Sequence, residues 1–319
     1  MAANPLISVV ILSYNSSKTI LETLDSIKAQ TYSPIELIVA DDGSPDNSAQ
    51  VCREWMSVNA DRFERCELLA AEKNTGISSN ANRGCRAARG TWLKVLAADD
   101  MLLPDACSTL CDFIQENPQS DIVIGKVQPF GDATSAREWL WHDPAVLLTQ
   151  LTPRQRSLQL LHYNFLPAAS AFIKRQCYEE LGGFEESIPL MEDWPFWIKA
   201  SCRNKCFTYL NHFTAKYRFC QTSVSQNGIQ DKASRYAKTQ AQAEAFANNY
   251  LRKYFFGVWL YELSKEKSRT SVLWWIIYKL KILNPSYYFA QKHAKTYQQL
   301  LQQHLAVNRK LIDEFMPLP

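Results

Sequence analysis

Two short apolar runs near the N-terminus, LISVVIL (6–12) and IELIVA (35–40), do not alternate regularly with polar residues. Such runs predict strands that are buried on both faces of a parallel sheet. The segment between them (16–30) repeats apolar residues at helical spacing, and a Thr-x-x-Glu pattern at Thr19 and Glu22 predicts a capping box at its start. We expect one helical face made of Ile20, Leu21, Leu24 and Ile27. The pattern therefore predicts a strand, a helix and a parallel strand.

The same alternation continues along the chain. A polar stretch from 47 to 59 has helical potential, CELLA (66–70) is a short strand candidate, 78–89 is a second helix candidate, and TWLKVLA (91–97) is a further strand. Strands that alternate with helices of this length form an open, mostly parallel α/β sheet with helices on both faces. In such sheets ligands bind where the loops leave the carboxyl ends of the strands. We therefore expect the loops 13–15, 41–48, 72–84 and 99–105 to gather at one edge.

Composition places the chain among ordinary globular proteins, with 319 residues, 46% of them hydrophobic and 21% charged. It contains no secretion signal pattern and no apolar run near the roughly 18 residues of a membrane span. Its nine cysteines form no C-x-x-C pair, which favours reduced thiols in the cytoplasm. Residues 251–319 hold eleven Lys/Arg against four Asp/Glu, interleaved with aromatic residues. This pattern suits a helix at a membrane surface or a helical layer packed on the main body.

The loop after the first strand lacks Gly-x-Gly-x-x-Gly, and the chain lacks a P-loop. The phosphates of a nucleotide would then need another neutralising group. Asp99 and Asp100, next to each other after the strand 91–97, could hold a divalent cation for this purpose. The alternative is that these residues cap the helix that begins near Pro104, where Asp105 could serve as well.

Four segments, which together carry five motifs in register, identify a family resemblance. They are PLISVVILSYNSSKTILETLDSIKAQTYSPIELIVADDGSPDNS, NTGISSNANRG, WLKVLAADD and LGGFEESIPLMEDWPFWIKA. Beyond these motifs, KYRFCQTSVSQNG (216–228) is similar to the family's closing segment. The chain from about Pro5 to Ala200 closely resembles the inverting family 2 glycosyltransferases. The resemblance implies a GT-A-type fold, a Rossmann-like sheet with flanking helices, and a helical C-terminal region.

The resemblance also assigns a donor site for a UDP-sugar. It implies that Tyr14 and Asp42 hold the uracil, since a carboxylate can accept the N3 hydrogen that cytosine lacks. The alternative role for Asp41 and Asp42 is a tight turn. For the loop 72–84, the alternative is a helix N-terminus capped by Ser78. The full set of implied donor-binding residues is Ser13, Tyr14, Asn15, Asp41, Asp42, Asn74, Gly76, Arg83, Asp99 and Arg218.

Mn²⁺ or Mg²⁺ is the implied cofactor, with Asp100 as direct ligand and Asp99 as a ribose or metal contact. Family members often carry a further aspartate at the position of Ala97, so one outer carboxylate is absent here. Asp193 is the implied catalytic base, which takes the proton from the acceptor hydroxyl, and Glu192 orients the acceptor. The alternative is that both acids are first-turn residues favoured by a helix dipole. A single displacement would invert the anomeric centre and give a β-linkage.

These inferences divide the chain into a nucleotide-sugar-binding half (1–128), an acceptor-binding half (129–230) of the same catalytic domain, and a helical, basic and aromatic C-terminal region (231–319). We expect a hexosyltransferase that extends a lipid-linked oligosaccharide in bacterial O-antigen or capsule synthesis. It would lie in the cytoplasm, peripherally on the inner membrane face, without a nucleic-acid partner. Two alternatives are a sugar nucleotidyltransferase, which would be expected to carry a glycine-rich loop after the first strand, and a non-catalytic nucleotide-sugar-binding module, which would not need Asp193.

Overall fold

The computed structural model describes residues 4–131, 144–219, 235–255 and 259. Its strands form one sheet of eight in the order β3-β2-β1-β4-β7-β6-β8-β5. The strands are β1 (Ile7–Ser13), β2 (Ile35–Asp41), β3 (Arg65–Ala70), β4 (Trp92–Ala97), β5 (Met101–Leu102), β6 (Ile122–Gly131), β7 (Ala171–Lys174) and β8 (Phe207–Phe219). The helices of nine or more residues are α1 (Ile20–Lys28), α2 (Ser48–Asn59), α3 (Ile77–Ala87), α4 (Ala106–Glu116), α6 (Pro153–His162), α8 (Asp193–Cys202) and α10 (Arg235–Tyr254). Shorter elements are α7 (Arg175–Glu180) and the 3-10 helices η1 (Ala60–Arg62), η2 (Pro144–Thr149) and η3 (Ala168–Ser170).

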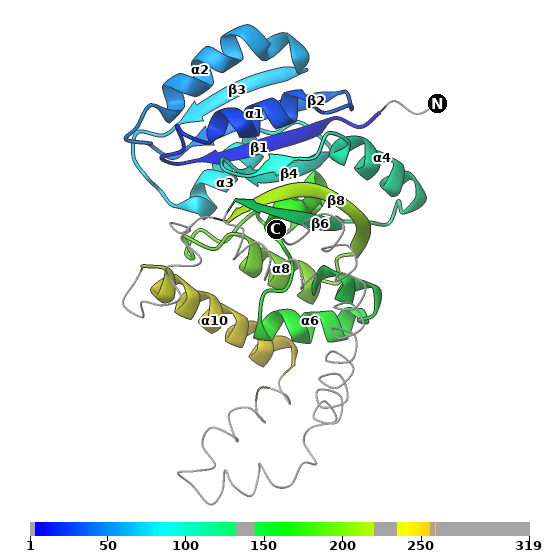
Figure 1. Cartoon of the computed structure of the whole chain (residues 1–319). Coiled ribbons are helices and arrows are strands. Elements are labelled where there is room, and N and C mark those ends of the chain that lie inside the picture. The colour runs from blue at the N-terminus through cyan, green and yellow to red at the C-terminus, as the bar shows by residue number, and fades with distance from the viewer. Residues whose placement is uncertain (1–3, 132–143, 220–234, 256–258, 260–319) are drawn as a thin grey trace, which may run out of the picture.

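The N-terminal part of the sheet is parallel, as the sequence predicts. Strand β1 pairs in parallel with β2 and β4, and β2 pairs in parallel with β3. Strand β7 is antiparallel to β4 and β6, whereas β6 and β8 run parallel to each other. The carboxyl ends of β1 to β4 therefore lie at one edge, and their four polar loops follow from that edge (Figure 1).

The sheet is covered on both faces, which explains the continuous apolar runs. Val9 and Ile11 of β1 belong to the core that contains α1, α2 and α4, whereas Val10 belongs to the core that contains α3, α6, α8 and α10. Successive residues of a strand point to opposite faces of the sheet. Because both faces are covered here, the residues on each face must be apolar. Strand β6 crosses the predicted boundary between the nucleotide-sugar-binding half and the acceptor-binding half at 128/129. The division into three regions remains a prediction.

Two local predictions for α1 are wrong. Thr19 precedes the helix but makes no side-chain capping bond, because its hydroxyl donates to the Ala98 carbonyl at 2.9 Å. Glu22 instead pairs with Arg218 at 2.5 Å. Leu21 is 45% exposed, so the buried face consists of Ile20, Leu24 and Ile27 with Thr23. Tertiary partners replaced the local capping box.

The close approach of α3 to the sheet depends on Gly84. A Cβ at this position would lie 2.3 Å from Cγ1 of Val10, a fully buried side chain of β1. We expect Gly84→Ala to lower the free energy of unfolding by about 1–3 kcal/mol through overpacking. Ser79→Ala, a half-buried change on the same helix, should cost less than about 1 kcal/mol. Urea unfolding of both variants checks the difference, and equal stability of Gly84→Ala and wild type would contradict the packing argument.

No described helix has the length and apolar character needed to cross a membrane. Most of the basic, aromatic C-terminal segment lies outside the described residues, and so does the predicted membrane contact. Positions 220 to 228 of the closing segment also lie outside them. Trp194 and Trp197 are described and buried in the core, with 5% and 1% of their surfaces exposed.

Candidate active site

The loop after β1 and the loop after β2 are joined through Asp41. The hydroxyl of Ser13 donates to the Asp41 carboxylate at 3.0 Å, and Ser44 donates to it through both its backbone N–H and its hydroxyl. Asn15 has a φ of 56°, a left-handed conformation that asparagine tolerates, and its N–H donates to the Ser44 hydroxyl. This arrangement leaves Tyr14 50% exposed at the sheet edge. The ring is therefore available to lie against a planar ligand.

Asp42 organises the loop after β3. Its carboxylate accepts hydrogen bonds from the backbone N–H of Thr75 at 3.0 Å, the Thr75 hydroxyl at 2.6 Å and the N–H of Gly76 at 2.8 Å. Arg83 from α3 donates to the same carboxylate at 3.2 Å. The anion thus receives the two backbone N–H groups that directly precede α3, at the helix end where the dipole favours negative charge. Contact of Asp42 with uracil remains a prediction.

Helix α3 follows Gly76, not Ser78. Gly76 precedes the helix with a φ of 94°, which suits glycine, whereas Ser78 lies inside the first turn. The alternative role of this loop, a helix N-terminus capped by Ser78, is therefore wrong, because the Ser78 hydroxyl donates to the Ile188 carbonyl. Asn74 is exposed just before this turn.

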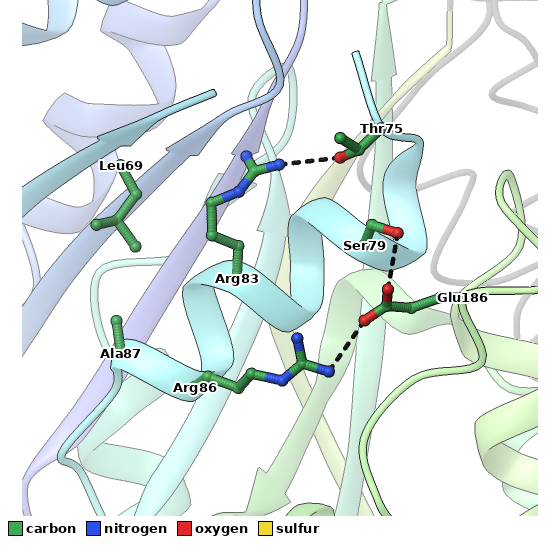
Figure 2. Close-up of a pocket in the computed structure, with 7 residues that line it drawn as sticks. All are labelled: Leu69, Thr75, Ser79, Arg83, Arg86, Ala87 and Glu186. Carbon is green, nitrogen blue, oxygen red and sulfur yellow. Dashed lines mark hydrogen bonds and ion pairs between the residues drawn. The ribbon is translucent and has the colours of Figure 1, made fainter. Parts of the chain in front are cut away.

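Arg83 lines a surface pocket of about 590 Å³ beside α3 (Figure 2). Its guanidinium donates to the Thr75 hydroxyl at 2.9 Å and to Asn80 at 2.7 Å, besides its ion pair with Asp42. Glu186 bridges Ser79 and Arg86 on the same helix, at 3.2 and 3.0 Å. Arg83 therefore supports the loop at Thr75 directly. Its contact with a diphosphate remains a prediction.

Asp99 and Asp100 do not cap a helix. Helix α4 begins at Ala106 after Asp105, whose side chain makes no capping bond either. Asp100 is 3% exposed and accepts the backbone N–H of Arg218 at 2.9 Å. Burial and the adjacent charge of Asp99 raise the pKa of Asp100 to about 8, and burial also raises that of Asp99. Two desolvated carboxyl groups thus stand side by side at the end of β4.

Arg218 of β8 closes this end of the sheet. Its guanidinium donates to the Asp99 carbonyl at 2.9 Å, pairs with Glu22 and lies 4.4 Å from the Phe130 ring centroid. Glu22 is a partner that the sequence analysis missed, because only the tertiary structure brings α1 to β8. A diphosphate contact of Arg218 remains a prediction.

Asp99 and Asp100 offer two adjacent carboxylates to a divalent cation, and the described part of the chain adds no third His, Cys, Asp or Glu ligand. Among the described residues, no group of three or more His, Cys, Asp or Glu side chains could hold a metal ion. Mg²⁺ often binds one or two protein carboxylates and takes its remaining ligands from phosphates and water. An adjacent carboxylate pair, unfavourably charged without a cation, matches that donor set.

Lys94 is a buried cation near this pair that the sequence analysis missed. It lies on β4 with its ammonium 3.3 Å from the Ala171 carbonyl, and it also donates to the Ala169 carbonyl. Burial lowers its pKa to about 7, and the charge of Asp100 opposes this shift. The sequence shows a lysine within an apolar strand, but it does not show that the ammonium is buried against the Ala169 and Ala171 carbonyls.

The acidic pair at the start of α8 forms the second part of the site. Asp193 begins the helix and Glu192 precedes it. The Asp193 carboxylate accepts the Asn164 side-chain amide at 2.7 Å and the N–H of Trp194 at 2.6 Å. Burial raises the pKa of Asp193, and burial together with the charge of Asp193 raises that of Glu192. The roles of catalytic base and acceptor contact remain predictions.

Two further residues near Asp193 were missed. Asn164 follows α6 and orients the carboxylate, although no motif marks it. Tyr236, in the first turn of α10, is partly buried, and burial followed by the charges of Asp193 and Glu192 raises its pKa. Both come from the second half of the chain, where the sequence offers no spacing rule.

The family description Glycosyl transferase family 2 matches residues 8–182, more than half of the chain. Glycosyltransferase GlyG of Streptococcus pneumoniae serotype 4 is 34% identical over 128 residues, which cover 40% of this chain and 41% of GlyG. The uncharacterized glycosyltransferase EpsJ of Bacillus subtilis is 27% identical over 252 residues, covering 77% of this chain and 71% of EpsJ. The matched part of GlyG is thus less than half of its length.

Solved structures share the fold. S. aureus TarS 1-349 in complex with UDP-GlcNAc has a TM-score of 0.56 and 16% identity, covering 97% of this chain and 92% of that chain. The complex of the same fragment with UDP has a TM-score of 0.55 and 17% identity, covering 97% and 91%. The expected GT-A-type fold is confirmed. On the strength of the match over residues 8–182, the chain belongs to glycosyl transferase family 2.

Proposed function

We propose that the protein transfers a sugar from a UDP-sugar to an acceptor hydroxyl with inversion at the anomeric carbon. The observation that carries the proposal is the environment of Asp193. Its carboxylate is held by Asn164 and by the N–H of Trp194 in α8, and its pKa is raised by burial. A positioned carboxylate with a raised pKa suits proton abstraction from a hydroxyl near neutral pH.

The donor part of the proposal rests on the strand-end loops. Tyr14 presents an exposed ring. Asp42 with Arg83 fixes the loop at Thr75 and Gly76, which we name the donor loop. TarS, which has a similar fold, was solved with UDP and with UDP-GlcNAc, and this supports a uridine nucleotide as the donor. We propose that Asp42 and Tyr14 hold the uracil of the donor and that Arg218 lies near its diphosphate.

Asp100 and Asp99 would hold Mn²⁺ or Mg²⁺. When bound, the cation supplies positive charge that makes the diphosphate a better leaving group. The protein's own contribution is then to orient the acceptor at Glu192 and to accept its proton at the Asp193 carboxylate. Attack from the face opposite the departing UDP would give a β-linkage from an α-configured donor.

The acceptor is the least constrained part. We propose a hydroxyl of a lipid-linked oligosaccharide in the synthesis of a bacterial surface polysaccharide such as O-antigen or capsule, with a hexose as the transferred group. The basic, aromatic composition of residues 231–319 supports peripheral contact with the inner face of the cytoplasmic membrane. These parts rest on family analogy and composition.

The test is UDP release from UDP-glucose, UDP-galactose and UDP-N-acetylglucosamine, with Mn²⁺ or Mg²⁺ and then with EDTA. We expect slow hydrolysis of one donor, loss of that rate on chelation, and loss of at least about 100-fold in Asp100→Ala. Calorimetry with UDP measures binding in parallel. Binding without turnover of any donor, even with lipid-linked acceptors supplied, would favour a non-catalytic binding module. Pyrophosphate release from UTP and a sugar phosphate would instead indicate a nucleotidyltransferase.

A further inference from the structure

Asn82 lies fully buried on α3, where it faces the loop 182–192 that leads to Asp193. Its Nδ2 donates to the Phe184 carbonyl at 3.0 Å and to the Glu186 carboxylate at 2.7 Å. Its Oδ1 accepts the Phe184 N–H at 2.9 Å and the Tyr178 hydroxyl at 2.7 Å. A carboxamide has two donors and two acceptor lone pairs, so this side chain is fully satisfied.

The loop is shaped to this amide. Gly183 has a φ of 76°, and a Cβ there would lie 2.8 Å from Oδ1 of Asn82 and 2.9 Å from the Tyr178 hydroxyl. Lys199 of α8 donates to the Gly183 carbonyl from the other side. The backbone at Gly183 is therefore held between α3 and α8 with no room for a side chain.

The same helix holds the rest of the loop. The Ser78 hydroxyl donates to the Ile188 carbonyl at 2.7 Å. A Cβ on Gly76 would lie 2.9 Å from Cβ of Pro189. Figure 2 shows Glu186 reaching Ser79 and Arg86 on the outer side of α3. Contacts thus run along the helix from its first turn to its last.

Helix α3 therefore touches both halves of the proposed site. Its N-terminus is fixed by the Asp42 carboxylate through Thr75 and Gly76, and its side carries the loop that ends at Glu192 and Asp193. We propose that Asn82 is a positioning residue, which couples the donor loop to the base by holding the loop 182–192 against α3. The inference rests on the proposed function, because it assigns Asp193 the role of base.

The first test separates positioning from donor binding. With whichever of the three UDP-sugars wild type hydrolyses fastest, we expect Asn82→Asp and Asn82→Leu to lower kcat about 10- to 100-fold, while KM for the donor stays within about threefold. The midpoint of the pH–rate profile should also shift. Ser78→Ala should show a smaller change in the same direction. Asn59→Leu, which removes the hydrogen bond from the Asn59 side-chain amide to the Trp55 carbonyl at the end of α2, should leave kcat within about twofold.

The second test needs no turnover. Amide hydrogen exchange is measured on wild type and Asn82→Leu with and without UDP and Mn²⁺. We expect UDP to slow exchange in both 74–80 and 183–193 of wild type, but only in 74–80 of Asn82→Leu. Equal protection of 183–193 in both proteins, or none in wild type, would overturn the coupling and leave the proposed function standing. If UDP fails to bind wild type in calorimetry, the proposed function falls and this inference falls with it.

Discussion

Asp193→Asn is expected to lower kcat about 10²- to 10⁴-fold while UDP binds with an affinity within about threefold of wild type. Asparagine keeps the size of the side chain and an oxygen that can accept the Trp194 N–H, but its NH2 group cannot accept the Asn164 amide. The variant therefore loses the basicity of the carboxylate together with one hydrogen bond. Steady-state UDP release and calorimetry with UDP measure the two quantities. Asp121→Asn is the matched control, because that carboxylate accepts the Cys206 backbone N–H and lies in another loop.

The pH dependence gives the same prediction a sign. Burial raises the pKa of Asp193 above its usual value, so more of the carboxyl is protonated at mildly acid pH than in a free aspartate. Only the deprotonated form accepts a proton, so kcat should rise with pH through that pKa and then level off. A wild-type rate that falls over the same range, or an Asp193→Asn rate near that of wild type, would remove this residue from the mechanism.

Asp42→Ala is expected to weaken UDP binding at least about 10-fold and to lower the free energy of unfolding by about 1–3 kcal/mol. The change leaves the N–H groups of Thr75 and Gly76 and the Arg83 guanidinium without their anionic acceptor. The donor loop then loses the group that orders it. Calorimetry with UDP and urea unfolding provide the measurements.

Asp46→Ala is the matched control for Asp42→Ala. Asp46 lies in the same loop and accepts hydrogen bonds from Ser17 and Ser48, but it does not contact the donor loop. We expect a comparable loss of stability with UDP affinity within about threefold of wild type. If both variants lost affinity equally, the effect would belong to the loop after β2 as a whole and not to Asp42.

The chain's own pattern was sufficient for the parallel part of the sheet. Residues buried on both faces of β1 and β2 must be apolar at every position, and α1 must carry an apolar face, so each element leaves a local signal. The predicted gathering of the four loops is confirmed, because parallel strands necessarily end at one edge. The family resemblance added the acidic pair at the start of α8.

The tertiary structure alone decided the partners of these residues. Glu22 had a local role available in a capping box, yet it pairs with Arg218, almost two hundred positions away in the chain. Asn164 reaches Asp193 only because α6 packs beside α8. No periodicity records such contacts, since each depends on the placement of elements that are distant in the sequence.

Asn82 shows the same limit most plainly. By sequence it is one polar residue in a helix with several others, and asparagine inside a helix is usually neutral or unfavourable. In the fold it satisfies four hydrogen bonds with Tyr178, Phe184 and Glu186. The sequence determined the strands β1 to β4, most of the apolar face of α1 and the edge where the loops meet, because local hydrophobic periodicity encodes them. Only tertiary packing decided which buried polar groups meet, because desolvation demands a partner but does not specify where in the chain that partner lies.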